Sequence, residues 1–596
     1  QTKMERAGGS AGAPEGDMSP SSGPWCRKPL WVVEMQSRGD TLAAAPSVEM
    51  APLASPGKQK DSSTDTWLGN EGRELSLRRS PSPGRHSSSP QRHLTLLDLL
   101  SIGIGGTVGS GIFVLCGLVA HSYAGPATAV SFAIAGLAAA ASGCCYAELA
   151  SKIPASGSTY AFSFVTIGEL AAVISAALLT LEYGVSGSAV ARSWGDKVME
   201  YIISQQHAES GSRVGRWMID TFSGSSLNPL AFMLSIAATI TLLSGVKESK
   251  RVVNSFTIIK LLLVAFMITL GFVYSRRENW TPFPPPEFGV AGIFRGATSS
   301  FFAFLGFDEV VCLAGESINP KRDLPPSVLL TIAGVSIVYI LAAFSLTGMQ
   351  PYGDISEASG FPEAFRKLGL NWAANIAALG EIVCLPLVVL ICLLAQPRLL
   401  QALAHDELLP PLFGNLQFGT LCSGIAMALI ALFVPFTFLD DFVSAGVLLA
   451  FCITNNAVAL FRASSHIRNP SSCDERRLFE RELASFNTVA FGGAFFLCYS
   501  YFYASILSIF AVVVLAIRLG KKMTKAQSGD GFEAPTGLPF VAIFINAVLI
   551  FQLEPLGLGI LFCFVSLCAL LYFWSSGSQG ADAEVKHRWS EAVRAS

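Results

Sequence analysis

The first long apolar segment of the chain contains the stretch Ser101-Ile102-Gly103-Ile104-Gly105-Gly106-Thr107-Val108-Gly109-Ser110-Gly111-Ile112-Phe113. Each glycine inside a helix costs about 1 kcal/mol relative to alanine, so a continuous helix is poorly stabilised here. Within lipid, the backbone N–H and C=O groups that a break sets free survive only where they line a cavity walled by protein. The stretch therefore predicts a membrane helix that is interrupted at mid-depth.

A second apolar segment also contains glycines that can interrupt a helix. It reads Gly296-Ala297-Thr298-Ser299-Ser300-Phe301-Phe302-Ala303-Phe304-Leu305-Gly306-Phe307-Asp308. The ends of broken helices carry partial charges of about +0.5 at N–H groups and about −0.5 at C=O groups, which suit a carboxylate and an ammonium respectively. Two broken helices at corresponding positions of two halves indicate a secondary transporter with inverted repeats. The alternative is that the glycines only let helices pack closely.

The composition agrees with a membrane location. Of 596 residues, 51% are apolar and only 14% are charged, whereas soluble domains carry about 25% charged residues. Lysine and arginine (41) nearly balance aspartate and glutamate (43), for a net charge of −2, so the chain lacks the basic surface of a nucleic-acid-binding protein. These numbers exclude a water-soluble enzyme and predict an all-α polytopic membrane protein.

From Leu96 onward, apolar runs of about twenty residues alternate with short polar breaks, and each run can cross a hydrocarbon layer of about 30 Å. The pattern predicts roughly fourteen transmembrane helices. They are expected near residues 96–119, 126–149, 168–191, 229–245, 255–274, 295–315, 326–349, 373–396, 421–438, 442–461, 486–500, 503–518, 538–553 and 557–574.

Residues 1–92 are rich in serine, proline and glycine and hold no periodic apolar segment, which predicts a disordered tail. The loops on the same side of the membrane as this tail hold about twice as many lysine and arginine residues as the loops on the other side. Both termini are therefore expected in the cytoplasm. The sequon Asn279-Trp280-Thr281 falls in an outward loop, which makes Asn279 a candidate glycosylation site.

The broken segments, together with several shorter motifs in the same order, resemble the cationic amino acid transporter family of the amino acid–polyamine–organocation superfamily. The resemblance covers nearly everything from Leu94 to Trp574. The shorter motifs are Ile153-Pro154-Ala155-Ser156-Gly157-Ser158-Thr159-Tyr160, Asn319-Pro320-Lys321-Arg322-Asp323-Leu324-Pro325, Asp406-Glu407-Leu408-Leu409 and Phe544-Ile545-Asn546.

The resemblance implies a five-plus-five inverted-repeat transporter fold. Residues 93–465 would form this core with its ten spans. Residues 466–537 would add a cytoplasmic loop and two further spans, and residues 538–596 would form a C-terminal two-span module and tail.

The resemblance also places an amino acid substrate between the two broken segments. It implies that the backbone amides around Gly109, Ser110 and Gly111 meet the substrate carboxylate, and that Phe302 acts as an aromatic gate. The substrate ammonium would meet the carbonyl groups of Thr107, Phe302, Ala303 and Leu305. This agrees with what helix-end electrostatics suggests for a zwitterion.

Three charged residues stand inside apolar segments. Glu381 either attracts a cationic side chain or caps the start of a helix. Lys260 costs about 2.5–3.5 kcal/mol at a helix centre unless it is neutral, paired or able to reach water. Proton-coupled bacterial relatives have a lysine at the matching place, which implies a proton-coupling role, and the alternative is a snorkelling lysine. Glu182 resembles an acidic position of the same relatives, and it either partners Lys260 or faces outer water.

The sequence thus favours a secondary active transporter that moves amino acids, preferably cationic ones, by alternating access, with proton coupling left open. The alternative is an amino-acid-sensing receptor with little flux. A membrane-embedded enzyme would need a nucleophile with a base, or metal ligands, at bilayer depth, and neither pattern is present, so no metal or cofactor is expected. The plasma membrane is the default location for the family, and a vacuolar or lysosomal membrane is the alternative.

Overall fold

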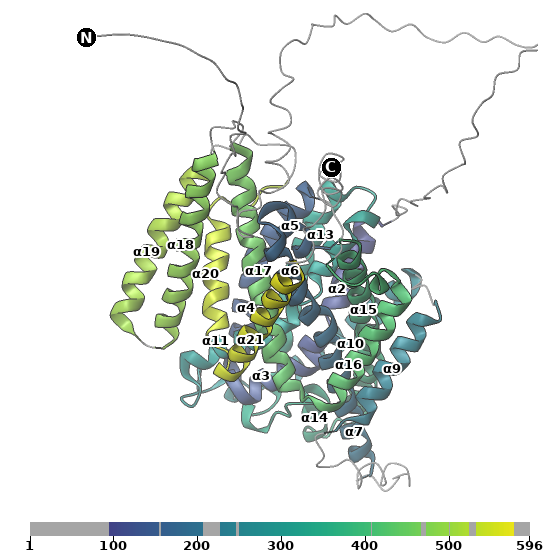
Figure 1. Cartoon of the computed structure of the whole chain (residues 1–596). Coiled ribbons are helices and arrows are strands. Elements are labelled where there is room, and N and C mark those ends of the chain that lie inside the picture. The colour runs from purple at the N-terminus through teal and green to yellow at the C-terminus, as the bar shows by residue number, and fades with distance from the viewer. Residues whose placement is uncertain are drawn as a thin grey trace, which may run out of the picture.

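The computed structural model describes residues 94–153, 157–206, 227–245, 250–406, 408–466, 473–499, 501–523 and 532–576. The expected tail at residues 1–92 lies outside this part, as do pieces of the loop and C-terminal regions. The regular elements of the described part are helices (Figure 1). A single isolated bridge pairs Leu94 with Ser317 among the described residues.

The first half of the described chain runs through two interrupted helices and their neighbours (Figure 1). Its elements are α2 (Leu96–Thr107), η2 (Gly111–Leu115), α3 (Cys116–Val119), η3 (Ala120–Ala124), α4 (Thr128–Lys152), α5 (Thr159–Thr166), α6 (Glu169–Thr180), η5 (Leu181–Val185), α7 (Ser186–Gln206), α9 (Pro229–Leu243), α10 (Lys250–Val273), α11 (Gly289–Phe301), η7 (Phe302–Phe304) and α12 (Phe307–Cys312).

The second half consists mostly of long continuous helices. They are α13 (Pro320–Met349), α14 (Gly360–Lys367), α15 (Asn371–His405), α16 (Leu416–Phe433), α17 (Phe436–His466), α18 (Cys473–Cys498), α19 (Phe502–Met523), α20 (Leu538–Ile550) and α21 (Pro555–Ser576). In Figure 1, α18, α19 and α20 stand together at one edge, and α21 crosses in front of α17.

The helices have the length and composition of membrane spans. In the described residues, nine helical stretches are long and apolar enough to cross a bilayer, and two shorter apolar helices, α9 and α20, accompany them. Large apolar side chains also face outward, such as Phe562 at 74% exposure and Leu507 at 70%. Water would not favour such a surface, whereas lipid would. The prediction of a polytopic helical membrane protein is confirmed.

The start and end of α2 follow from local chemistry. At its start, the Thr95 N–H donates to Asp98 Oδ2 (3.0 Å) and the Asp98 N–H donates to Thr95 Oγ1 (3.4 Å), so a capping box begins the helix. The helix ends at Thr107, the backbone of the next residue, Val108, is extended (φ −71°, ψ 106°), and η2 begins after Ser110. The predicted interruption of the first span is confirmed.

The second interruption lies between α11 and α12. The chain passes through η7, then Leu305 is extended (ψ 144°) and Gly306 adopts φ 113°, a conformation that side chains rarely tolerate. The two interrupted segments touch each other, because a Cβ on Gly111 would lie 2.6 Å from Ala303 Cβ and from the Tyr339 hydroxyl. Close packing also applies at Gly105, where a Cβ would lie 2.4 Å from Thr257 Oγ1. The glycines therefore have both expected roles: they interrupt the helices and they let neighbouring helices pack closely.

Other elements surround this crossing. The helix α2 packs on α10, α12 and α13, while α4 lies along α13 and α11. On the other side α15 packs against α7 and α16, and α17 packs against α20. Both breaks therefore lie between α4 and α13 on one side and α7 and α15 on the other.

Several features of the fold differ from the expected spans. The helix α7 continues to Gln206, whereas its span was expected to end near residue 191. The short helices α5 and α14 were not expected, and α18 begins at Cys473 rather than near residue 486. The first turns of α18 contain Asp474, Glu475, Arg476 and Arg477. A hydropathy pattern detects the apolar part of a helix and misses turns that extend into water.

A buried ion pair joins α4 to α17 at the end of the bundle where α2 begins. The guanidinium of Arg462 donates to both carboxylate oxygens of Glu148, with Nε 2.8 Å from Oε1. The same guanidinium donates to the Ala534 carbonyl at 2.5 Å, and the Ala534 N–H donates to Glu148 Oε2 at 2.9 Å. The pair therefore also holds the segment that leads into α20.

Removing one partner of this pair leaves a buried charge, which costs about 3–5 kcal/mol. We expect Arg462→Met to lower the unfolding temperature of the purified protein by several degrees, measured by fluorescence in detergent. Arg518→Met, which loses an ion pair at a side chain that is 62% exposed, serves as the control and should change it little. An unchanged unfolding temperature for Arg462→Met would contradict a structural role for the pair.

Candidate functional site

A cavity opens where both helices are interrupted. Its walls come from both breaks and from η5, α7 and α15. The residues that line it are Gly106, Thr107, Ser110, Glu182, Ser186, Val190, Phe302, Leu305, Gly306, Asp308, Val388 and Cys392.

The expected substrate residues divide into two groups. Thr107, Ser110, Phe302 and Leu305 line the cavity. Gly109, Gly111 and Ala303 do not line it but form the backbone behind it, where a Cβ on Gly109 would lie 3.1 Å from Val388. Four of the seven expected substrate residues thus line the cavity, and their role in binding stays a prediction.

The first span becomes helical again after its break, and the N-terminus of this second helical part carries the expected partial positive charge. The backbone N–H of Phe113 donates to the Gly109 carbonyl at 3.1 Å. The N–H groups of Ser110 and Gly111 come just before this bond, at the position where a helix start leaves donors without intrahelical partners. Such groups bind carboxylates well.

The carbonyl ends at the two breaks are joined by one side chain that sequence reasoning missed. The hydroxyl of Tyr339, on α13, donates to the Thr107 carbonyl (2.7 Å) and the Ala303 carbonyl (2.9 Å). A hydroxyl has a single proton, so the two carbonyls share it. The Phe302 carbonyl also accepts a hydrogen bond, from the Leu305 N–H at 3.3 Å. Three of the four carbonyls expected to meet an ammonium therefore already accept a hydrogen bond, although each oxygen keeps a second lone pair. The only sequence signal was a tyrosine inside an apolar span.

Lys260 stabilises the same region from α10. Its Nζ lies 2.8 Å from the Gly105 carbonyl, and the residue is 1% exposed. The ammonium thus sits at the carbonyl end of α2, where a positive charge is favourable. The snorkelling alternative is wrong, because the side chain ends against buried backbone rather than water.

Two carboxyl groups meet at one end of the cavity. Glu182 lies in the π-helical turn η5 and Asp308 in α12, and they are 2% and 1% exposed. Both line the cavity, and each lies in the electrostatic environment of the other. The hydroxyl of Tyr183 donates to Asp308 Oδ2 at 2.8 Å. We call Glu182 and Asp308 the acid pair.

Glu182 thus lies at the cavity together with Asp308, whereas the sequence predicted that it partners Lys260 or faces outer water. Asp308 belongs to the second interrupted segment, and the sequence did not predict a role for it. Its signal was its place two residues after the break at Gly306, since a residue next to an interrupted helix lies near the cavity that the interruption lines.

Glu381 lies elsewhere. Its Oε2 is 2.7 Å from Lys197 Nζ, and both side chains are 2% exposed. Lys197 also donates to the Ala358 carbonyl at 2.6 Å, so this pair joins α7, α15 and the segment before α14. Glu381 is not among the residues that line the cavity. The capping alternative is wrong, because α15 begins at Asn371 and Glu381 lies well inside it.

Asn279 lies in the short helical turn η6 (Arg277–Trp280). Its Nδ2 donates to the Gly348 carbonyl at the end of α13 at 2.7 Å. The nitrogen that glycosylation would modify is therefore engaged within the fold. Among the residues that the structure describes, no group of three or more His, Cys, Asp or Glu side chains is arranged to hold a metal ion.

Comparisons with known proteins agree with this geometry. The family model for amino acid permeases matches residues 94–580. The chain is 34% identical over 405 residues to "Cationic amino acid transporter 4, vacuolar" of Arabidopsis thaliana, covering 65% of this chain and 67% of that protein. It is 36% identical over 383 residues to the methylthioribose transporter of Bacillus subtilis, covering 63% and 82% respectively.

A human protein, cationic amino acid transporter 4, is 34% identical over 396 residues, which cover 64% of this chain and 62% of that relative. The chain thus spans somewhat less than two thirds of the human relative, about two thirds of the plant relative and 82% of the bacterial one.

The role of Tyr339 can be tested without knowing the ligand. Tyr339→Phe removes one oxygen and leaves two buried carbonyls without that donor, which costs about 1–3 kcal/mol. We expect a lower unfolding temperature and faster amide hydrogen exchange in the peptide covering residues 105–113, measured by mass spectrometry. Tyr503→Phe, at a side chain that is 87% exposed, is the control. Equal exchange in wild type and Tyr339→Phe would refute the role.

Proposed function

The chain belongs to the amino acid permease family, within its cationic amino acid transporters, and on this premise we propose that it is a secondary active transporter of amino acids that works by alternating access. The single observation that carries the proposal is the contact between two interrupted helices at a buried cavity. The relatives are named as transporters or permeases, which favours flux over a receptor that only senses amino acids.

We extend the proposal to the architecture. In chain order, α2–α3, α4, α6–α7, α9 and α10 form one set of spans, and α11–α12, α13, α15, α16 and α17 form a second set. The first member of each set is interrupted, as expected for a five-plus-five inverted repeat. With α18 to α21, the chain crosses the bilayer roughly fourteen times. The positive-inside bias of the loops supports a cytoplasmic location for the end where α2 begins.

The substrate zwitterion would lie across the two breaks. Its carboxylate would meet the N–H groups around Ser110 and Gly111 at the start of η2. Its ammonium would meet the carbonyl groups of Phe302 and Leu305, and those of Thr107 and Ala303 beside the Tyr339 hydroxyl. The ring of Phe302 would gate the site together with Phe436 of α17, since the two ring centroids lie 5.9 Å apart.

The acid pair favours cationic side chains among possible substrates. Two carboxyl groups line the cavity, and none of its lining residues is a lysine, arginine or histidine. Relatives named as cationic amino acid transporters support this preference. One relative is named a branched-chain amino acid permease. Transport of cationic amino acids should therefore be compared with transport of neutral ones.

We also propose that Lys260 and Glu182 couple transport to protons. A protonated Lys260 holds the carbonyl end of α2 through Gly105, and loss of its proton would release this end. Glu182 carries a carboxyl group directly in the cavity. The plasma membrane is the proposed location, with a vacuolar or lysosomal membrane as the alternative. Glycosylation of Asn279 would first require release of its contact with Gly348.

The function can be tested with the purified full chain in proteoliposomes. We expect saturable uptake of labelled arginine and lysine, weaker uptake of leucine and little of glutamate, each measured with and without an imposed pH gradient. Binding of these amino acids without any uptake or exchange would favour the receptor instead. The absence of both binding and uptake would overturn the proposal.

Coupling through Lys260 makes a separate prediction. Lys260→Ala should retain exchange of internal for external substrate but lose accumulation driven by a pH gradient, because the titratable contact with α2 is gone. Thr257→Val is a matched control on the same helix, since it removes a hydrogen bond to the Ser101 carbonyl (3.3 Å) without removing a titratable group. Continued pH-driven accumulation by Lys260→Ala would eliminate the proposed coupling role.

A further inference from the structure

We propose that Arg295 is a positioning residue of the transport cycle. Its contacts hold α11, the first half of the second interrupted helix, against α17. These contacts must open before a substrate can pass between the cavity and the end of the bundle opposite to the start of α2, which we call the far end. The inference rests on the proposed function and adds to it the contact that closes one of the two paths to the cavity.

Arg295 lies near the far end, on the short helix that leads to the cavity. Leu94, just before α2, pairs with Ser317, which follows α12 and the short turn after it, so α12 ends where α2 begins. The helix α11 precedes α12 in the same span and therefore begins at the far end. It continues directly into η7, whose first residue, Phe302, lines the cavity. Arg295 is the only charged residue of α11.

One face of α11 and η7 meets the start of α17 through three successive pairs of side chains. Positions 295, 299 and 302 are four and three residues apart, so they share one face of a helix. The pairs are Arg295 with Asp441 (Nη2 to Oδ2 2.7 Å and to Oδ1 2.8 Å), Ser299 with Asp440 (Oγ to Oδ2 2.6 Å) and Phe302 with Phe436 (ring centroids 5.9 Å apart). We call these three pairs the α11–α17 contact. It extends from the charged pair near the far end to the cavity.

Arg295 also contacts the first interrupted span. The central carbon of its guanidinium lies 4.7 Å from the ring centroid of Tyr123, which is a cation–π contact. Tyr123 belongs to η3, which continues the first span beyond its break. One turn before Arg295, a Cβ on Gly292 would lie 2.2 Å from the Tyr123 carbonyl oxygen, so α11 and η3 touch there. The side chain of Arg295 therefore joins the far-end halves of both interrupted spans to α17.

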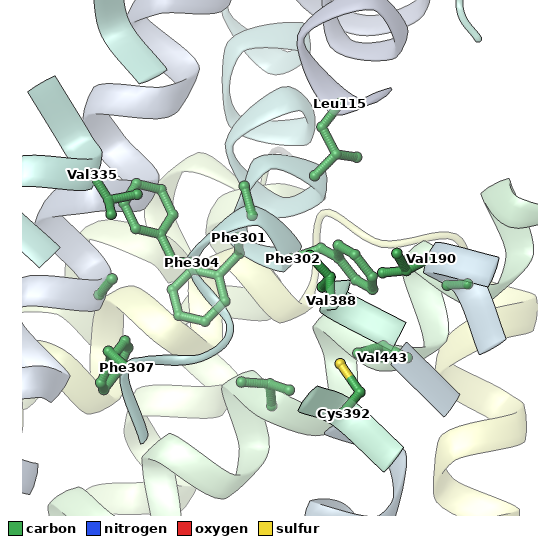
Figure 2. Packing of buried hydrophobic residues seen from close by; sticks show 14 of the residues in the cluster. Leu115, Val190, Phe301, Phe302, Phe304, Phe307, Val335, Val388, Cys392 and Val443 are labelled. Atoms are coloured by element: carbon green, nitrogen blue, oxygen red, sulfur yellow. The ribbon is translucent and has the colours of Figure 1, made fainter. Parts of the chain in front are cut away.

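The ring of Phe302 forms the inner end of the α11–α17 contact. In the view of Figure 2, this ring lies beside Val190 and Val388, with Leu115 above it and Cys392 below it. All of these residues except Leu115 line the cavity. A molecule that enters from the far end therefore meets the α11–α17 contact before it reaches Cys392.

Two features allow the α11–α17 contact to open and close. The side chains of Arg295 and Asp441 are 15% and 10% exposed, so water can solvate both charges when they separate, whereas a fully buried pair loses this compensation. The helix α11 has only 13 residues and is followed by the break at Leu305 and Gly306, so it can tilt at this hinge. The helix α17 is continuous over 31 residues.

The other side-chain contacts of α11 are compatible with this movement. The hydroxyl of Thr298 donates to the Leu549 carbonyl of α20 at 2.9 Å and lies 3.1 Å from the Phe294 carbonyl of its own helix. If α11 tilts away from α20, this hydroxyl therefore still has an acceptor. The hydroxyl of Ser131 donates to the Ile293 carbonyl at 2.9 Å and joins α11 to α4, so these two helices can move together.

A reversible crosslink tests whether the α11–α17 contact must open. Arg295→Cys is combined with Asp441→Cys in the full chain, and a short bis-methanethiosulfonate joins the two thiols in proteoliposomes. We expect uptake of labelled arginine to fall at least tenfold on crosslinking and to recover when a reductant splits the crosslink, because α11 can no longer separate from α17. A contact that stays closed throughout transport predicts no loss.

Two controls receive the same reagent. The wild type reports the reaction of the native cysteines. Glu363→Cys combined with Arg366→Cys replaces an ion pair within α14 (3.1 Å), so its crosslink joins no two helices. The loss of uptake is measured relative to both controls.

Thiol accessibility tests Arg295 by itself and does not require transport. In nanodiscs, a charged methanethiosulfonate should modify Cys392 at least threefold faster in Arg295→Met than in the wild type, because the far end is open in a larger fraction of molecules. Peptide mass spectrometry measures the rate. Cys452 of α17, which is 3% exposed and does not line the cavity, should keep its rate. Arg295→Lys retains a cation beside Tyr123 and Asp441 and should stay close to the wild type.

The outcomes separate this inference from the proposed function. Uptake that the crosslink leaves unchanged, or an equal Cys392 rate in Arg295→Met and the wild type, would overturn the inference and leave the transporter intact. Faster modification of Cys392 and Cys452 together would also overturn it, because it would indicate general loosening. If the double-cysteine variant is inactive before crosslinking, the Cys392 rate decides. If the wild type neither binds nor transports any amino acid, the proposed function itself fails.

Discussion

The structure depends on one constraint: a helix that is interrupted inside a bilayer must find partners for the backbone groups it releases. Here the partners come from other elements. Lys260 of α10 bonds to the Gly105 carbonyl, and Tyr339 of α13 bonds to carbonyls of both interrupted segments. Within α2, Thr107 Oγ1 donates to the Gly103 carbonyl at 2.7 Å. These contacts keep the breaks open beside a cavity rather than closed into continuous helices.

The same constraint governs the charged side chains. Away from the cavity, ion pairs join helices: Glu148 with Arg462, Lys197 with Glu381, and Arg295 with Asp441 at 2.7 Å. Each pair joins elements far apart in the sequence, because a buried charge is tolerated only next to its complement. The acid pair at the cavity differs, since two groups of the same sign meet there.

The sequence predicted the parts of this arrangement that depend on local chemistry. Clustered glycines located the first interruption, apolar runs located most of the helices, and the cost of burying charge singled out Lys260 and Glu182. It missed the early start of α18, whose first turns are polar, and the short helices α5 and α14, which are too brief for a periodic pattern. It also selected Glu381, which the structure places in an ion pair with Lys197 instead of at the cavity.

The amino-acid sequence by itself thus determined that the chain is helical, that it enters a membrane, and where its helices break, because composition, hydropathy and glycine content act over a few turns. Only the tertiary structure decided which side chains meet at those breaks. Tyr339 lies 232 positions from Thr107, and Lys260 lies 155 positions from Gly105. Helical periodicity states that a residue faces inward, but it does not state which neighbour it meets, since that depends on how all the helices pack together.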